Sequence, residues 1–571
     1  MKKLINLLTI SSLIILMMTS CSPLNKMKKH ATDIKYNVEP KVLEANAGKV
    51  DLDLDVNIPA KYFNKNVVVE ATPVLVYGDQ EKAFETKVLQ GEDVKENNTV
   101  VPYNSSKSVK YKGSIPYDKA MRVAKLEMRL KLRKGDKTVD VPAIKIADGV
   151  VSTSTLVIND PKVVIGADAF QRIIKETKAA DIHYLINSSY VRWKEMKGAD
   201  VKDLESFIKD VKKNDRQELK GVEIKAYASP DGKEDENAKL AGKRDVSAKK
   251  FLKKKMRKIE EFKVEEFFKS LVTPEDWDGF KKLMEESNIQ DKEIILRVLS
   301  MYNDPEVRER EIKNISSAFT AIAKEILPKL RRSQILVNIN NIGLSNEEIL
   351  TAVKNDINSL KVEELLYSAT LVEKAADKLM IYETAMKNFS QDWRGYNNAG
   401  LVKFNSKDYT AAKSLFEKAA ALSQNNKVIN NNLGAVELIN GNVDKAKVFF
   451  GAAAGLGKAL DYNNGIVAMK EGKYTEAVKY FGSCKTVNSA LASILTDNTS
   501  EALRKLDEVK GEEAMVSYLR AVIGAKTSNK DLVIAGLKSA IEKDGSLKET
   551  ASTDMVFAKY FSDADFKAIV K

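Results

Sequence analysis

The sequence predicts a multidomain protein with an N-terminal all-β sandwich, a middle α+β domain with a helical insertion, and a C-terminal α-helical array. Its 571 residues are too many for one hydrophobic core. Apolar and polar residues alternate in its first part, as in "KVDLDLDVNI". Glycine, aromatic and small residues recur about every 34 residues in its last part, which indicates stacked helical repeats.

Residues 1–20 have the pattern of an export signal. Lys2 and Lys3 precede an apolar run that ends at Met18, too short to span a membrane comfortably. Small residues then stand directly before Cys21, and this arrangement resembles a bacterial lipoprotein signal. The resemblance implies that Cys21 is the acylated first residue of the mature protein, bound to a membrane by its lipid. Residues 21–35 are expected to form a tether.

The charge of the chain narrows the class of partner. Without Lys2 and Lys3 it has 91 basic and 80 acidic residues, a net charge of +11. Such an excess suggests nucleic acid in a cytosolic protein, but behind a lipoprotein signal the available polyanions belong to the envelope, so no nucleic acid is expected. Basic residues follow Cys21 in "PLNKMKKH", whereas surface-exported lipoproteins of the Bacteroides group tend to have acidic ones there. We therefore expect an outer-membrane protein that faces the periplasm.

Few residues could carry catalysis. Cys484 is the only cysteine besides Cys21, and it is expected at a helical position as a small buried hydrophobe. The two histidines, His30 and His183, are far apart, and His183 lies in a predicted strand. The sequence therefore predicts no enzyme, no cofactor and no metal site. Three acidic residues alternate along one strand and are expected to face solvent rather than bind calcium: Asp51, Asp53 and Asp55.

Residues 36–161 are expected to form the β-sandwich. After "KVDLDLDVNI", the runs "NVVVEATPVLVYG" and "KLEMRLKLRKGDKTVDVPAIKI" repeat the strand pattern, and the residues Lys-Gly-Asp-Lys supply a hairpin turn in the second. The stretch "IPAKYFNKNVVVEATPVL" resembles the sandwich ahead of OmpA-like domains in Bacteroides-type lipoproteins.

Residues 162–345 read as strand, helix, strand, turn and helix, in "ADIHYLINSSYVRW", "GADVKDLESFIKDVKKN" and "VEIKAYASPDGKEDENAKLAGKRDVSAKKFL". Four residues fall at the spacings of the peptidoglycan-binding motif of outer membrane protein A: Gly232, Asn237, Leu240 and Arg244. The region therefore resembles an OmpA-like domain. About sixty residues separate its second helix from a closing strand near 335–339, similar to the insertion of Bacteroides-type OmpA-like proteins.

The resemblance implies a site for the peptidoglycan stem peptide at Asp231, Asn237 and Arg244. The guanidinium of Arg244 would bind a carboxylate of the peptide. Ser229 stands where the family has an acidic residue and cannot supply its negative charge. Asp231, two residues later on the same turn, could approach the site from a different direction and supply that charge. Peptidoglycan binding and a purely structural or protein-binding platform both stay open. For the basic run 239–258, a solvated helix face and attraction to an anionic envelope surface also stay open.

Residues 346–571 contain the repeat. The set Gly400, Tyr409, Ala412, Phe416 and Ala419 recurs 34 residues later from Gly434, and again from Gly465 after a contraction to 31. This period and these residue types identify the region as tetratricopeptide repeats, whose concave face holds extended peptides or helices. Asparagines 397, 398, 430, 431, 432, 463 and 464 lie near the start of successive first helices. An asparagine there could clamp a peptide backbone, or be an ordinary exposed or capping residue. The candidate partner-binding residues are Asn397, Asn398, Asn431, Asn432 and Asn464.

Two functions follow as expectations. The first is a non-enzymatic, lipid-anchored periplasmic scaffold or adaptor that binds envelope proteins through the repeats, by analogy within envelope assembly or secretion machinery. The second is a peptidoglycan tether that links the outer membrane to the cell wall. An enzyme acting on glycans would need two converging carboxylates, and no motif in the sequence places such a pair.

Overall fold

The computed structural model describes residues 22–511 and 513–571. The predicted signal and the lipidation residue Cys21 lie outside this part. The described chain forms two compact units, one made of residues 22–166 together with 389–571 and the other of residues 167–388. Among the described helices, none combines the length and the apolar composition that a bilayer crossing requires.

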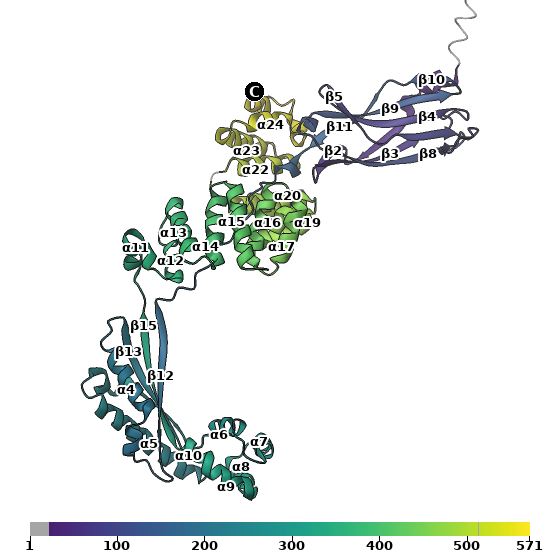
Figure 1. The fold of residues 1–571 in the computed structure, drawn as a ribbon. Helices are drawn as coiled ribbons and strands as arrows, with labels where there is room; N and C mark the ends of the chain where they lie inside the picture. Colours follow the sequence, from purple (N-terminus) through teal and green to yellow (C-terminus); the bar gives the residue numbers. More distant parts are fainter. Residues whose placement is uncertain (1–21, 512) are drawn as a thin grey trace, which may run out of the picture. The chain divides into compact units, whose positions relative to one another are not determined.

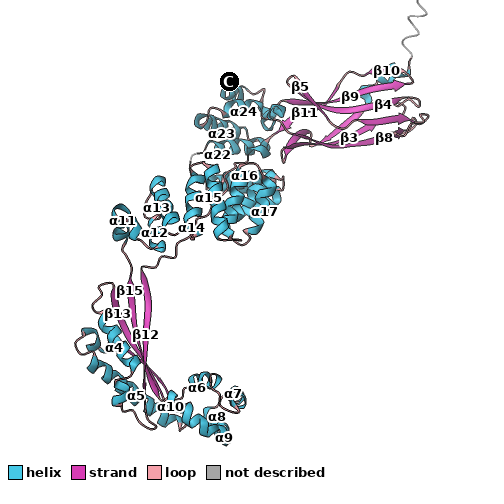
Figure 2. Cartoon of the chain, viewed as in Figure 1, coloured by secondary structure: helices cyan, strands magenta, loops and turns pink. Residues whose placement is uncertain are grey.

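The N-terminal region of the first unit, residues 35–151, is a mixed sheet of eleven strands folded into two layers (Figures 1 and 2). β2 connects the layers because it pairs antiparallel with β3 and parallel with β11. The strand order is β1-β3-β2-β11-β9-β4-β6-β7, with β8 beside β3, β10 beside β9 and β5 beside β4. The strands are β1 (Lys35–Glu39), β2 (Val42–Asn46), β3 (Lys49–Ile58), β4 (Val68–Tyr77), β5 (Gln80–Ala83), β6 (Lys87–Gly91), β7 (Thr99–Val101), β8 (Lys107–Pro116), β9 (Ala124–Lys134), β10 (Lys137–Asp140) and β11 (Ile144–Val151).

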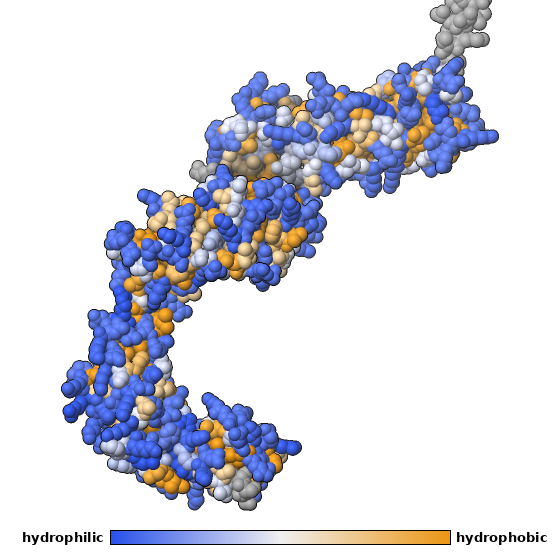
Figure 3. Space-filling model, in the orientation of Figure 1, coloured by the Kyte–Doolittle hydropathy of each residue, from blue (hydrophilic) through white to orange (hydrophobic). Residues whose placement is uncertain are grey.

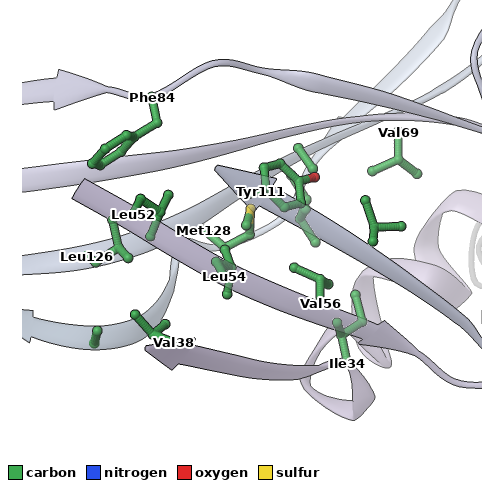
Figure 4. Close-up of a cluster of buried hydrophobic side chains, with 14 of the residues drawn as sticks. Ile34, Val38, Leu52, Leu54, Val56, Val69, Phe84, Tyr111, Leu126 and Met128 are labelled. Carbon is green, nitrogen blue, oxygen red and sulfur yellow. The ribbon is translucent and has the colours of Figure 1, made fainter. Parts of the chain in front are cut away.

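The core of this region lies between the two layers (Figure 4). β3 buries every second side chain, including Leu52, Leu54 and Val56, as its alternating sequence predicts. Leu126 and Met128 of β9 contribute to the same cluster from the other layer. Each fully buried side chain of this size stabilises the fold by about 1.5–3 kcal/mol.

The residues expected to form a tether are packed against this core instead. α2 (Pro23–Lys29) buries Leu24 and Met27, and the short helix η2 (Ala31–Asp33) follows it. Apolar residues three apart on one helix face can seat on a neighbouring surface even in a short segment. That spacing distinguishes residues 23–33 from a flexible linker.

The second unit contains a four-stranded sheet in the order β12-β15-β13-β14, with β13 and β14 parallel and the other pairs antiparallel. The strand–helix–strand–helix order, the helical insertion and the closing strand follow the sequence prediction, whereas β14 is an additional edge strand. The elements are β12 (Ile173–His183), α3 (Trp193–Met196), α4 (Ala199–Val211), β13 (Gln217–Tyr227), α5 (Glu234–Lys255), η5 (Glu260–Lys263), η6 (Glu265–Phe267), β14 (Phe268–Thr273), α6 (Trp277–Glu285), α7 (Lys292–Met301), α8 (Pro305–Asn314), α9 (Ser316–Glu325), α10 (Leu327–Leu330) and β15 (Arg332–Ile342).

The helices that follow the closing strand also belong to the second unit. They are α11 (Asn346–Asn355), η7 (Ile357–Ser359), α12 (Val362–Ser368) and α13 (Ala375–Asn388). Arg216 donates to the Glu348 carboxylate at 2.8 Å, and the ring of Phe170 stacks on Tyr367 at 4.5 Å. The sequence places the start of the repeat array at residue 346, but the compact array begins with the helix after residue 389.

The rest of the first unit is an array of antiparallel helix pairs, called here the array, residues 389–571. Side-chain caps begin several helices, among them Asp408, Asn426 and Thr486. The helices are α14 (Trp393–Asn405), α15 (Tyr409–Leu422), α16 (Lys427–Ile439), α17 (Val443–Ala452), α18 (Lys458–Lys470), α19 (Tyr474–Phe481), α20 (Val487–Leu495), α21 (Thr499–Asp507), α22 (Ala514–Lys526), α23 (Lys530–Lys543), α24 (Leu547–Thr553), η8 (Met555–Tyr560) and α25 (Ala564–Val570). Cys484 lies after the end of α19 and is half-buried, so the expected helical position is wrong.

The β-sheet region packs against the C-terminal helices of the array within the first unit (Figure 1). β11 contacts η8, and the Tyr474 hydroxyl donates to Asn46 Oδ1 at 2.7 Å. Hydrophilic side chains cover much of the visible face (Figure 3). Residues 152–166 lead from the end of β11 to the array and are hydrogen-bonded to its helices.

Candidate functional site: an asparagine ladder and the turn beside Arg244

Residues 157–166, which we call the strap, run along the first helices of successive pairs in the array. They form no helix or strand of their own. The side chains that meet the strap come from α14, α16, α18 and α20. One turn of each helix presents an asparagine to the strap.

Four asparagines each hold one strap residue by both of its backbone groups. The asparagine Oδ1 accepts from the strap amide, and the Nδ2 donates to the carbonyl of the same residue. The O···N distances for these two bonds are 2.8 and 2.8 Å for Asn488 with Ile158, 2.6 and 2.9 Å for Asn463 with Lys162, 2.7 and 2.7 Å for Asn432 with Val164, and 2.7 and 2.9 Å for Asn398 with Gly166. Alternate strap residues therefore face the helices, as in an extended chain.

Two further asparagines connect the clamps of Asn398, Asn432 and Asn463 into a continuous chain of hydrogen bonds, and these five residues together with Asn488 are called here the ladder. Asn431 donates to the Lys162 carbonyl at 2.9 Å and to Asn432 Oδ1 at 3.1 Å, and it accepts from Asn463 at 3.0 Å. Asn397 occupies the equivalent place one repeat earlier, with bonds to Val164 and to its two asparagine neighbours. All six of these asparagines are buried. A buried amide whose donors and acceptor are all paired has a fixed orientation, so the ladder is preorganised.

At Asp160 no asparagine clamps the backbone of the strap. The array binds the carboxylate of this residue instead. The Tyr462 hydroxyl donates to Asp160 Oδ1 at 2.7 Å, and Asn488 Nδ2 donates to the same oxygen at 3.1 Å. Lys162 Nζ lies 2.6 Å from Asp160 Oδ2 and 4.7 Å from the centre of the Tyr462 ring. Burial and, secondly, the neighbouring carboxylate raise the pKa of Tyr462, so its phenol stays protonated and remains a donor.

The sequence predicted most residues of the ladder, but for one of them it predicted Asn464 in place of its neighbour Asn463. Asn397, Asn398, Asn431 and Asn432 lie in it, whereas Asn464 is half-buried and makes none of the clamping bonds. Asn463 clamps instead. The clamping asparagine stands two residues before Gly400, Gly434 and Gly465, so the contraction of the repeat to 31 residues already pointed to Asn463. Asn488 was missed because it follows Asn463 by only 25 residues, outside the period.

The peptidoglycan-site candidates surround the turn after β13. Arg244 of α5 is 1% exposed and donates to the carbonyls of Tyr227, Ser188 and Leu185 at 2.8, 3.0 and 3.4 Å. Burial lowers the pKa of Arg244 to about 10. Within the described residues, no carboxylate lies at ion-pair distance from this guanidinium. Arg244 therefore binds a loop and the end of β13 of its own chain through neutral acceptors.

Asp231 and Asn237 lie at the same turn, and both have partners within the protein. Asp231 pairs with Arg331 at 2.8 Å and accepts from the Ser229 hydroxyl at 2.5 Å. Asn237 donates to the carbonyls of Gly232 and Ser229 at 3.1 and 3.3 Å. The sequence did not single out Arg331 as a site residue. Its place directly before β15, which brings it back to the turn, is visible only in the folded sheet.

One family model and several solved structures match parts of this chain. Residues 394–426, which comprise α14 and α15, match the family model of the tetratricopeptide repeat. No curated protein matches the chain. A tetratricopeptide repeat protein from Parabacteroides merdae is 15% identical over 37% of this chain and 91% of that chain, with a TM-score of 0.29. YrrB, a tetratricopeptide repeat protein with an unusual peptide-binding site, is 20% identical over 35% and 94%, with a TM-score of 0.21. The Cut9–Hcn1 complex is 14% identical over 59% and 75%, with a TM-score of 0.31.

The family match and the period of the sequence together show that the C-terminal region carries tetratricopeptide repeats. Repeats of this class indicate a protein that binds other proteins.

Proposed function

We propose that the protein is a non-enzymatic scaffold, attached by lipid on Cys21 to the outer membrane and facing the periplasm, which recruits envelope proteins through its array. The observation that carries the proposal is the tetratricopeptide repeat array, because repeats of this class present extended surfaces that bind other proteins. The signal-like residues 1–20 and the basic residues after Cys21 support the attachment and its periplasmic side.

Recruitment is tested with photo-crosslinking residues at exposed positions of the array in living cells. Val448 on α17 is 74% exposed and Tyr480 on α19 is 43% exposed. A crosslinker at Val100, which is 46% exposed in the β-sheet region, is the matched control. We expect discrete adducts with another envelope protein at Val448 or Tyr480 and none at Val100. Equal labelling at all three positions would exclude recruitment by the array.

Lipid attachment is tested separately by feeding cells a labelled fatty acid. The wild-type chain should incorporate the label and sediment with membranes, because acyl chains bury enough methylene groups for stable anchoring. Cys21→Ala should abolish both properties. An unlabelled wild-type protein in the soluble fraction would exclude the anchor and leave the recruitment experiment unaffected.

A second candidate function, a tether to peptidoglycan, is favoured by the environment of Arg244. Its buried guanidinium has only neutral acceptors around it, and a buried charge is usually paired. A carboxylate of the stem peptide would supply such a partner if the loop that contains Leu185 and Ser188 moved aside. The resemblance to OmpA-like domains suggests this ligand.

The tether is tested by sedimentation with purified peptidoglycan sacculi. Wild-type protein should pellet with the sacculi, and Arg244→Lys and Asp231→Asn should reduce the pelleted fraction several-fold. Lys243→Ala removes an exposed charge next to Arg244 and is the control. Thermal unfolding of each variant shows that it is folded. If Arg244→Lys and Asp231→Asn both pellet to the same extent as the wild type, the motif at the turn does not bind peptidoglycan.

A further inference from the structure

The ladder recognises a backbone in a fixed register, which defines the kind of segment that it fits. Residues 162, 164 and 166 each present an amide and a carbonyl to one asparagine. Because asparagine offers a donor and an acceptor on one planar group, it pairs with both groups of one residue whatever its side chain is. Backbone pairing therefore selects an extended segment but not its sequence.

Side-chain contacts at the two ends add selectivity. At Gly166, a Cβ atom would lie 2.9 Å from the ring of Trp393 and 3.0 Å from Arg394 Cγ, so only glycine fits without a shift. At Asp160, the Tyr462 hydroxyl and the Asn488 amide both donate to the carboxylate. Ile158 packs against the apolar cluster of the later repeats. The fitting segment thus has a branched aliphatic residue, an acid two residues later and a glycine six residues after the acid.

We infer that the ladder is a binding site for an extended peptide of this pattern, and that the strap is its resident ligand, bound in the same chain, which keeps partner peptides out. All four clamps are filled by the strap, and the residues before it are anchored as well, since the Ser154 hydroxyl donates to the Ala45 carbonyl at 2.6 Å. The strap follows directly on the sheet region, which itself packs on the array, so its effective concentration at the ladder is of order mM, as for a ligand on a short linker. A partner peptide at micromolar concentration is therefore excluded until the strap leaves.

This inference goes beyond the proposed function and does not depend on it. Recruitment by the array would then use its outer positions while the strap is bound, and the ladder would become available only after release of the strap. Membrane attachment has no part in the argument. Failure of the experiment below would leave the crosslinking and fatty-acid results unchanged.

The test uses the full chain and a labelled synthetic peptide of residues 155–168, "TLVINDPKVVIGAD". The first variant replaces residues 157–166 by a glycine-serine stretch of equal length, which empties the ladder. We expect this variant to bind the peptide at least tenfold more tightly than the wild type, as measured by fluorescence anisotropy. Adding Asn432→Ala and Asn463→Ala should weaken that binding at least tenfold. A peptide with leucine in place of the glycine at position 166 is the control ligand and should not bind.

Hydrogen exchange on the wild-type chain provides a measurement that does not depend on the emptied variant. The amides of Ile158, Lys162, Val164 and Gly166 should exchange as slowly as those of the helices that clamp them. In Asn432→Ala the amide of Val164 should exchange at least tenfold faster than in the wild type. This measurement decides the question if the emptied variant does not fold.

Three results would overturn the inference. The wild type could bind the peptide as tightly as the emptied variant, or the strap amides could exchange at the rate of an unstructured peptide. The third is a dimer whose ladders are filled by the strap of the other copy. Sedimentation of the wild type at micromolar concentration detects that dimer, and a monomer supports binding within one chain.

Discussion

At the scale of single residues, the clamps show why asparagine is suited to binding the backbone of the strap. Each clamping amide binds an N–H and a C=O that would otherwise lose their water partners against the array. An unpaired buried group of this kind costs about 1–3 kcal/mol, whereas a satisfied bond contributes about 1 kcal/mol net. The ladder is therefore sensitive to the loss of any one member.

Asn432→Ala should lower the free energy of unfolding by about 2–4 kcal/mol, because it leaves the amide of Val164 unpaired and removes one of the two hydrogen bonds to the Val164 carbonyl. It also removes a partner of Asn397 and of Asn431. Urea denaturation measures the change. Asn464→Ala, at a half-buried position that makes no clamp, is the matched control and should stay within about 0.5 kcal/mol. Equal losses in the two variants would contradict the ladder.

A buried carboxyl predicts a dependence of stability on pH. Asp554 accepts from the Tyr518 hydroxyl at 2.8 Å, and burial raises the pKa of Asp554. Because the folded state binds this proton more readily than the unfolded state, the contribution of Asp554 is most favourable in acid and is lost as pH rises through its folded pKa. Asp554→Asn removes the titration. Its melting temperature relative to the wild type should therefore rise with pH above about 4, and a difference that is constant with pH would contradict the burial effect.

The sequence predicted individual site residues only where they follow the period of the repeats. Asn397, Asn398, Asn431 and Asn432 were found because the glycines two or three residues later keep the same period. That these amides bind the strap of the same chain was not predictable, since residues 157–166 carry no pattern that pairs them with the array. Arg244 is buried against the carbonyls of Leu185 and Ser188 in a loop and of Tyr227 at the end of β13, and four motif positions do not determine the conformation of that loop.

At the scale of secondary-structure elements, each repeat depends on a close approach between its two helices. Gly400, Gly434 and Gly465 lie opposite the rings of Phe416, Phe450 and Phe481, and a Cβ atom on these glycines would come within 2.7, 2.5 and 2.5 Å of the ring carbons. The sequence predicted these elements well, because a regular period gives both the helices and their contact face. It did not predict β14 or α2, because segments of six and seven residues are too short to show a period.

Gly434→Ala should destabilise the protein by about 1–3 kcal/mol, since the added methyl group displaces the ring of Phe450 in a close-packed interface. Thermal and urea unfolding measure the loss. Gly451→Ala is the control, because a Cβ atom on that α17 residue meets nothing within 4 Å. In an open helical position alanine is favoured over glycine by up to about 1 kcal/mol. Destabilisation by both variants would exclude the close approach as the cause.

At the scale of the whole molecule, the first unit is assembled from two stretches of chain that are separated by the second unit. Gly166 and the start of the array lie close together, because Gly166 contacts Trp393 and hydrogen-bonds with Asn398. The two chain ends at which the first unit is interrupted, residues 166 and 389, thus lie close together within that unit. The domain boundaries expected at residues 161 and 345 differ from this division, since composition and period cannot show that a linker is bound by a distant repeat.

Replacement of residues 167–388 by a short glycine-serine linker should therefore leave the first unit folded. Its two stretches are held together by the strap and by the contact of the sheet region with the last helices, neither of which involves the removed residues. Circular dichroism should show one cooperative thermal transition. Adding Asn398→Ala, Asn432→Ala and Asn463→Ala to the shortened chain should lower its melting temperature by about 10 °C, as roughly 6–12 kcal/mol is lost. The strap does not join the two stretches if the shortened chain melts without cooperativity. The same holds if the three substitutions leave its melting temperature unchanged.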